Sequence, residues 1–272
     1  MSVRLGIIGG GVMGEALLSR LLAQGVYLAE DILLGEPSGT RRQELSDRYS
    51  IRTTDSNQDV IEASQTVLLA VKPQIFELVA KDFRAVRCDR PPLVISILAG
   101  VPLAKLESLM ADVPAIRAMP NTPATVGEGM SAIATGRDAS KEQADLAKEL
   151  FSAVGQVVQV PEGMLDAVTG LSGSGPGYVA MVIEALADGG VAAGLPRAIA
   201  RQLALQTVLG TAELVKQTAL HPAELKDQVT SPGGTTIAGV ARLEELGLRS
   251  ALIEAVKTAS ARSRELGNSS DS

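Results

Sequence analysis

The chain has 272 residues, of which 46% are hydrophobic and 21% charged, a composition typical of a folded globular protein and not of a disordered or collagen-like one. A net charge of −6 without any basic block argues against nucleic acid and a membrane as partners. One histidine, His221, and one cysteine, Cys88, exclude a multi-histidine zinc site, a cysteine-cluster metal site and an intrachain disulfide, so no metal is expected.

The first part of the chain alternates short apolar runs with amphipathic stretches. Strands are predicted at residues 3–8, 32–34, 67–71, 93–98 and 115–119, with an edge strand at 156–160. Helices are predicted at residues 12–24, 41–48 and 141–154. Near-continuous apolar strands with helices between them predict a parallel sheet covered on both faces, so we expect an α/β domain over residues 1–160.

After Pro161 the strand signals end and helical patterns continue to residue 266. Helices are predicted at residues 163–171, 178–193, 196–217, 223–229, 236–246 and 250–266. The stretch 178–214 is rich in small and aliphatic residues on more than one helical face, and only 2% of the chain is aromatic. A helix that is apolar all round requires burial on all sides. We therefore expect residues 161–272 to form an all-helical domain whose helices interlock with those of a second subunit.

The first predicted strand leads into a glycine-rich loop in which Gly9, Gly11 and Gly14 form the pattern G-x-G-x-x-G. Between a strand and a helix, this pattern is typical of a Rossmann dinucleotide-binding domain. The backbone from Gly9 to Gly14, including Val12 and Met13, is expected to hold a pyrophosphate at the helix N-terminus. The alternative is a glycine-rich turn without a ligand.

Charged residues after the second strand leave the choice of nucleotide open. Glu36 is placed to bond a ribose 2′-hydroxyl and so favours NADH. Arg41 and Arg42 follow, and a cation at Arg41 could hold the extra phosphate of NADPH. Alternatively, all three are solvated surface charges.

Prolines and polar residues follow the later strands, at residues 71–74, 99–101 and 119–123. In open α/β sheets, ligands bind beyond the carboxyl ends of strands. Lys72, Asn121 and Thr122 are therefore candidates to line a nicotinamide pocket, although turns of this kind also end ordinary strands.

A second glycine cluster lies in the helical part, where Gly233 and Gly234 stand among the hydroxyl residues Ser231, Thr235 and Thr236. A loop of this kind at a helix N-terminus suits a small anion such as a substrate carboxylate. The alternative is a simple N-cap supplied by Thr235 or Thr236. A similar cluster around Ser174 could form a second wall of the same pocket.

Together these segments resemble pyrroline-5-carboxylate reductase over almost the whole chain. The resemblance is carried by residues 6–14, 69–73, 119–123, 166–176 and 221–236. It implies a Rossmann domain followed by an all-α dimerisation domain, homodimers that often assemble to decamers, and NADPH- or NADH-dependent reduction of a cyclic imino acid to proline. Glu36 departs from the neutral or small residue that many members carry, which puts their usual NADPH preference in question.

The resemblance also implies site residues. Cofactor contacts are expected in the glycine loop, at Asn121 and in the turn Ala70, Val71, Lys72 and Pro73. The loop from Ser231 to Thr236 is expected to hold the substrate carboxylate, and the Thr236 hydroxyl to contact the ring nitrogen.

Two other readings compete with this one. A β-hydroxyacid-type dehydrogenase has a similar glycine loop, but its chemistry requires a lysine early in the helical domain, and residues 160–215 contain none. A non-catalytic nucleotide-sensing protein is the other. The first residues lack a signal-peptide layout and no apolar run has membrane-spanning length, so we expect a cytoplasmic protein.

Overall fold

The structure is a computed structural model that describes residues 3–86, 90–110 and 113–268, so Cys88 lies outside the described residues. The chain divides into two compact units, Met1–Gly173 with Thr258–Ser272, and Ser174–Lys257. These units differ from the predicted division at residue 160. Residues just after that position and the end of the last helix belong to the first unit, where the Ser263 hydroxyl donates to Asp166 at 2.6 Å.

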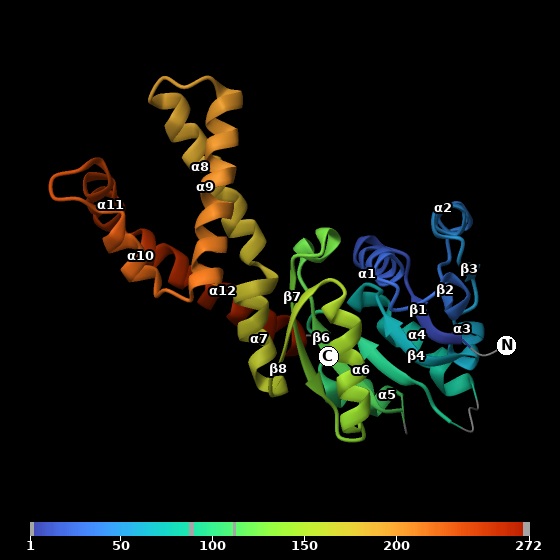
Figure 1. The fold of residues 1–272 in the computed structure, drawn as a ribbon. Helices are drawn as coiled ribbons and strands as arrows, with labels where there is room; N and C mark the ends of the chain where they lie inside the picture. Colours follow the sequence, from blue (N-terminus) through green and yellow to red (C-terminus); the bar gives the residue numbers. More distant parts are fainter. Residues whose placement is uncertain (1–2, 87–89, 111–112, 269–272) are drawn as a thin grey trace. The chain divides into compact units, whose positions relative to one another are not determined.

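In the first unit the described residues form one eight-stranded sheet in the order β3-β2-β1-β4-β5-β6-β7-β8. The strands are β1 (Val3–Ile8), β2 (Ile32–Gly35), β3 (Arg52–Thr54), β4 (Ser64–Leu69), β5 (Leu93–Ser96), β6 (Ala115–Met119), β7 (Gly129–Thr135) and β8 (Gly155–Gln159). The accompanying helices are α1 (Val12–Ala23), α2 (Gly39–Tyr49), α3 (Asn57–Ala63), α4 (Phe76–Ala85), α5 (Leu103–Leu109), α6 (Lys141–Ser152) and α7 (Leu165–Val168) (Figure 1).

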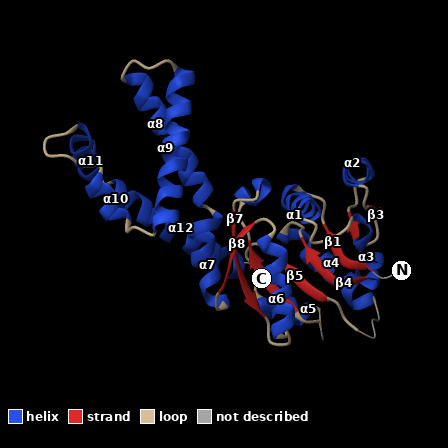
Figure 2. Cartoon of the chain, viewed as in Figure 1, coloured by secondary structure: helices blue, strands red, loops and turns tan. Residues whose placement is uncertain are grey.

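Apolar side chains cover both faces of this sheet, as predicted. Figure 2 shows the strands of the sheet in red and the helices that accompany them in blue. Alternate residues of a strand point to opposite faces. Leu5 and Ile7 therefore pack with α1 and α6 on one face, while Ile8 joins Phe76 of α4 on the other. The three phenylalanines and Tyr27 are buried, so four of the six aromatic residues lie in the core.

The expectation of a purely parallel sheet is wrong at one pairing, so that β7 and β8 run opposite to the other strands. β7 pairs antiparallel with β6, whereas the other neighbours are parallel. A parallel return requires a crossover of a dozen or more residues, and the link from Pro120 to Glu128 is shorter than that. All six predicted strands are present, but β3 and β7 were missed because β3 has three residues and β7 is rich in small and polar ones.

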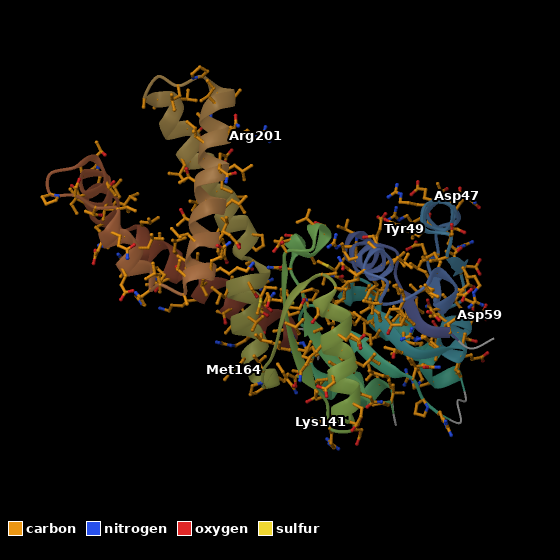
Figure 3. The ribbon with its side chains drawn as sticks, in the orientation of Figure 1. Asp47, Tyr49, Asp59, Lys141, Met164 and Arg201 are labelled. Carbon is orange, nitrogen blue, oxygen red and sulfur yellow. The ribbon has the colours of Figure 1, made fainter. Side chains whose placement is uncertain are left out.

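The second unit is helical. It contains α8 (Gly175–Ala192), α9 (Arg197–Thr218), α10 (Pro222–Gln228), α11 (Thr235–Glu245) and the first part of α12 (Leu248–Asn268), and α8 and α9 lie side by side (Figure 1). Many of its side chains point to solvent, Arg201 of α9 among them (Figure 3).

One predicted helix, at residues 163–171, belongs to the first unit and is not continuous. The structure has there a 3-10 turn, the short α7 and a π-helical turn, Thr169–Gly173.

Exposed apolar side chains are frequent on α8 and α9. Met181 is 69% exposed, Leu205 53% and Leu209 58%, whereas the buried residues of these helices are Ala187, Ala200 and Ala204. Among the helices that the structure describes, none combines the length and hydrophobicity needed to span a membrane.

Candidate functional site

The loop between β1 and α1 has glycines for different reasons. Gly9 has φ +110°, and a Cβ there would lie 2.5 Å from the carbonyl oxygen of Ala70. A Cβ on Gly14 would lie 2.2 Å from the carbonyl oxygen of Gly9. A Cβ on Gly11, in contrast, would meet no described atom within 4 Å. The first two glycines let the chain pack on itself, and Gly11 presents bare backbone to open space.

This backbone begins α1. Gly11 is the N-cap residue, and no side chain of the described residues caps the helix. The first N–H groups of a helix have no partner within it, and the helix dipole places partial positive charge there. Gly11, Val12, Met13 and Gly14 therefore offer the uncapped N-terminus that a pyrophosphate requires.

A hollow of about 360 Å³ lies beside the loop, beyond the carboxyl ends of β1, β2 and β4. Of the residues predicted to bind the cofactor, it is lined by Gly9, Gly11, Glu36, Ala70, Val71 and Lys72. Asp55, Asn57, Ile75 and Leu78 also line it and were not predicted. Asp55 directly follows β3, so recognition of that strand would have pointed to it. The size and polar rim suit part of a dinucleotide.

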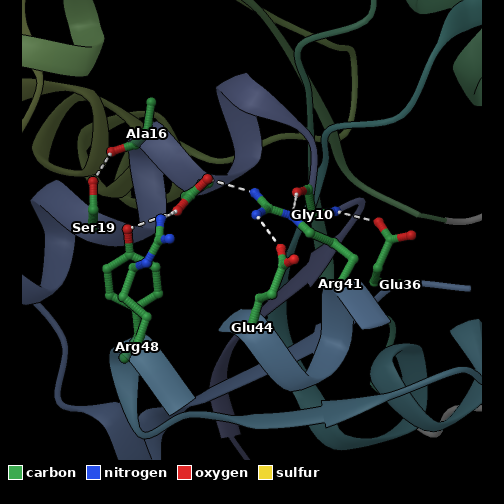
Figure 4. A network of polar contacts seen from close by, with 9 residues as sticks. Gly10, Ala16, Ser19, Glu36, Arg41, Glu44 and Arg48 are labelled. Atoms are coloured by element: carbon green, nitrogen blue, oxygen red, sulfur yellow. Dashed lines mark hydrogen bonds and ion pairs between the residues drawn. The ribbon is translucent and has the colours of Figure 1, made fainter. Parts of the chain in front are cut away.

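Glu36 is fixed at the rim of this hollow. Its Oε2 accepts a hydrogen bond from the N–H of Gly10 at 3.0 Å (Figure 4). Its Oε1 accepts one from the N–H of Ser38 at 3.1 Å. Its own N–H donates to the carbonyl oxygen of Thr54 at 3.0 Å. The carboxylate is therefore held in one place by the backbone of two loops.

Arg41 does not line the hollow, and its guanidinium already has partners. Nε donates to the carbonyl oxygen of Gly10 at 2.9 Å, Nη1 donates to Glu44 at 3.1 Å, and Nη2 pairs with Glu15 (Figure 4). Arg42 donates to the carbonyl oxygens of Glu36 and Pro37 and pairs with Asp55. The structure thus engages both cations that the sequence offered for a second phosphate.

Glu15 is the shared acceptor of this cluster. Besides Arg41, it accepts hydrogen bonds from Arg48 at 2.6 Å and from the Tyr49 hydroxyl at 2.9 Å. Partial burial alone would raise the pKa of its carboxyl. The hydrogen bonds from Arg41 and Tyr49 and the two guanidinium charges outweigh burial and hold that pKa below its usual value.

Asn121 is not at the hollow either. Its Oδ1 accepts from the N–H of Met130 at 2.8 Å, and its Nδ2 donates to the carbonyl oxygen of Ser172 at 3.0 Å. The residue is only 9% exposed. One N–H and one lone pair of the amide are thereby used within the protein, which favours a structural role for Asn121, and its contact with the cofactor stays a prediction. Val12, Met13, Gly14 and Pro73 also lie outside the lining residues.

The second glycine cluster, in the helical unit, forms the N-terminus of α11. Gly234 is the N-cap residue, and no side chain in the described part of the protein caps the helix, so the alternative of a cap from Thr235 or Thr236 does not hold. Gly233 has φ +67°, and a Cβ on Gly234 would lie 2.3 Å from Ser231 Oγ. The side chains of Thr235 and Thr236 are exposed. The loop therefore presents backbone N–H groups and hydroxyls to solvent.

Two other predicted positions lie in the same unit. Ser174 precedes α8, and its carbonyl oxygen accepts from the N–H of Gly177 at 3.0 Å. His221 caps α10, since its Nδ1 accepts from the N–H of Ala223 at 3.2 Å. Among the described residues no group of three or more His, Cys, Asp and Glu side chains is placed to hold a metal ion.

Comparison with known proteins gives matches along the whole chain. Residues 162–266 match a family described as pyrroline-5-carboxylate reductase dimerisation, and residues 4–100 match one described as NADP oxidoreductase, coenzyme F420-dependent. A pyrroline-5-carboxylate reductase of Synechocystis sp. is 61% identical, with 98% of this chain and 99% of the relative covered. The corresponding protein of Arabidopsis thaliana is 43% identical, with 98% and 97% covered.

Solved structures agree with these relatives. A pyrroline-5-carboxylate reductase from Coxiella burnetii has a TM-score of 0.91 at 32% identity, covering 98% of this chain and 99% of its own. A pyrroline carboxylate reductase from Plasmodium falciparum, solved with NADP bound, has a TM-score of 0.87 at 30% identity, covering 97% and 98%.

Proposed function

The chain belongs to the pyrroline-5-carboxylate reductase family, and from this premise we propose which of its residues carry the family's reaction. It is an NAD(P)H-dependent oxidoreductase that reduces the imine of 1-pyrroline-5-carboxylate to give L-proline. The predicted family, fold class and reaction are confirmed. Neither a β-hydroxyacid-type dehydrogenase nor a non-catalytic nucleotide-sensing protein is needed to explain the chain.

We assign the cofactor to the hollow at the carboxyl ends of β1, β2 and β4. The observation that carries this is the open backbone of Gly11 at an uncapped helix N-terminus, in one hollow with Ala70, Val71 and Lys72. N–H groups of the loop bind the pyrophosphate, Glu36 binds the adenosine ribose, and the turn after β4 borders the nicotinamide. When bound, the cofactor supplies the hydride that reduces the imine carbon.

We assign the substrate to the loop before α11. Its uncapped N–H groups bind the carboxylate, with Ser231, Gly233, Gly234 and Thr235 shaping the loop. The Thr236 hydroxyl orients the imine nitrogen, and Ser174 forms a second wall. A protonated imine is already electrophilic, so the protein's contribution is to position the two reactants. That suits a chain with a single histidine, which here caps a helix.

The helical unit supports oligomerisation, since residues 162–266 match the family's dimerisation domain. We propose a homodimer in which the exposed apolar side chains of α8 and α9 are buried by a second copy, and further assembly to a decamer. We also place the enzyme in the cytoplasm, at the last step of proline biosynthesis.

Turnover tests the assignment directly. Purified enzyme with 1-pyrroline-5-carboxylate should oxidise NADH or NADPH, followed by loss of reduced-nicotinamide absorbance, and should form proline. Cofactor binding measured separately, by calorimetry, distinguishes the two sites. Binding without turnover would contradict the substrate assignment, and absence of binding would contradict the cofactor assignment.

A further inference from the structure

We infer that Glu36, supported by Asp55, makes this enzyme prefer NADH to NADPH. The inference rests on the cofactor assignment above. It adds which part of the dinucleotide lets the enzyme distinguish NADH from NADPH. NADPH differs from NADH by a phosphate on the 2′-oxygen of the adenosine ribose. The question is therefore which charges this chain presents at the adenosine end of the hollow.

The adenosine end is on the β2 side of the glycine loop. In Rossmann domains an acidic residue at the end of the second strand bonds the 2′-hydroxyl of that ribose. Glu36 follows Gly35, which pairs with Ile8 at the end of β1. Asp55 follows β3, the next strand in the same direction. Both acidic residues line the hollow.

The Glu36 carboxylate is not free to turn away from a second phosphate. Both its oxygens already accept backbone hydrogen bonds, from Gly10 and from Ser38. A carboxylate oxygen can still accept a further bond from a ribose hydroxyl, because each oxygen has two lone pairs. A phosphate has no such hydrogen to donate when ionised, and its negative charge would lie against a fixed negative charge.

The neighbouring cations do not offset this repulsion. Arg41 and Arg42 are the cations nearest in sequence, and their guanidinium groups are held by Glu15, Glu44, Asp55 and backbone carbonyls. Of the described residues that line the hollow, three are charged, namely Glu36, Asp55 and Lys72. Lys72 follows β4, which pairs with β1 on the side opposite to β2. Arg42 and Asp55 largely cancel each other as an ion pair, so Glu36 supplies the uncompensated negative charge on the adenosine side, and Asp55 contributes by holding Arg42 away from a second phosphate.

Two ligand fragments isolate this end of the dinucleotide. Calorimetry should show that the wild-type enzyme binds ADP-ribose at least about tenfold more tightly than 2′-phospho-ADP-ribose. Glu36→Gln keeps the side-chain length and an acceptor for Gly10, and should reduce that ratio at least about fivefold, chiefly by tightening the phosphorylated ligand. Asp55→Asn, at an exposed position, should reduce it in the same direction. Asp47→Asn is the control. It also removes one negative charge, but Asp47 lies on α2 and does not line the hollow (Figure 3), so the ratio should stay unchanged.

The outcomes separate this inference from the assignment beneath it. If the wild-type enzyme binds both fragments but prefers the phosphorylated one, or if Glu36→Gln strengthens both equally, the NADH preference is wrong and the cofactor site stands. If neither fragment nor either dinucleotide binds, the cofactor assignment fails and the preference with it. KM values for NADH and NADPH should show the same order as the fragments.

Discussion

The Nε of Arg41 donates a hydrogen bond to the carbonyl oxygen of Gly10 across 2.9 Å, and so ties α2 to the glycine loop. The same residue pairs with Glu15 in α1. One guanidinium thereby connects the loop to the helices on both sides of it. Arg41 is placed to hold the loop in shape, which differs from both alternatives that the sequence left open, a ligand for the extra phosphate of NADPH and a solvated surface charge.

Replacement of Arg41 distinguishes the two roles. Arg41→Ala should weaken NADH and NADPH binding by the same factor, about tenfold, because the lost hydrogen bond involves a charged donor and shapes the loop that both cofactors share. Arg48→Ala is the matched control, since Arg48 also pairs with Glu15 but is not among the described residues that hydrogen-bond to Gly10. Calorimetry measures both. If Arg41→Ala weakened the binding of NADPH alone, Arg41 would instead be a ligand of the extra phosphate.

Glu15 should contribute to the loss of stability of the folded protein in acid. Its folded-state pKa is lower than the ordinary 4.5, so its stabilisation is complete above that value and is lost as the pH falls through the lower one. Glu15→Gln should therefore lower Tm by about 2–4 °C at pH 7, and the difference from wild type should shrink as the pH falls below 4.5. Glu62→Gln, on the exposed face of α3, serves as the control. A constant difference at every pH would contradict the prediction.

Two glycines of the loop, Gly11 and Gly14, should separate binding from folding. Gly11→Ala adds a methyl group into open space, so Tm should stay within about 1 °C of wild type while both cofactors bind at least about tenfold more weakly. Gly14→Ala forces a methyl group against the carbonyl of Gly9 and should lower Tm as well. Gly163→Ala, also in open space but outside the loop, should change neither quantity. Unchanged cofactor affinity in Gly11→Ala would remove Gly11 from the site.

Most of the fold could be predicted because its strands are apolar and its loops carry glycine and proline. The apolar run of β1, the glycines after it and the spacing of α1 agree with one another, so sequence and structure coincide there almost to the residue. β3 and β7 carry no such signal. Their pairing depends on neighbouring strands and not on their own composition, which a local pattern does not contain.

The site was predictable where backbone requirements determine the residue. Gly9 and Gly14 are identifiable because no other residue fits their positions. The hydrogen-bond partners of side chains could not be predicted, because they are residues far away in the sequence. Asn121 reaches Ser172, 51 positions away, and Arg41 reaches Glu15, 26 positions away. A polar residue after a strand looks the same in sequence whether it faces a ligand or another part of the protein.

Asn121 should therefore behave as a structural residue. Asn121→Ala leaves the partly buried N–H of Met130 without its acceptor, at a cost of about 1 kcal/mol or more, and should lower Tm by several degrees. Affinity for either cofactor should stay within about twofold of wild type at a temperature where the variant is folded. Thr122→Ala, the next residue along, tests whether the turn itself is sensitive. A large loss of cofactor affinity without a change in Tm would return Asn121 to the cofactor site.

Thr236 carries the sharpest chemical prediction, because it is exposed at the start of α11 and nothing caps that helix. Thr236→Val preserves the branched shape but removes the hydroxyl, and should lower kcat/KM at least about tenfold, or about 1.4 kcal/mol of transition-state stabilisation. If the hydroxyl orients the reacting nitrogen, kcat falls. If it only helps to bind the carboxylate, KM rises with kcat unchanged.

Two further variants complete that test. Thr236→Ser restores the hydroxyl and should recover most of the activity. If Thr236 only shaped the helix, the valine and serine variants would have the same activity. Thr218→Val, in α9, removes a hydroxyl that bonds the carbonyl oxygen of Leu214, and should leave kcat/KM unchanged. Cofactor affinity should be constant across all three, because Thr236 is assigned to the substrate alone. Wild-type kinetics in Thr236→Val would exclude the hydroxyl from the reaction and leave only backbone N–H groups to hold the imino acid.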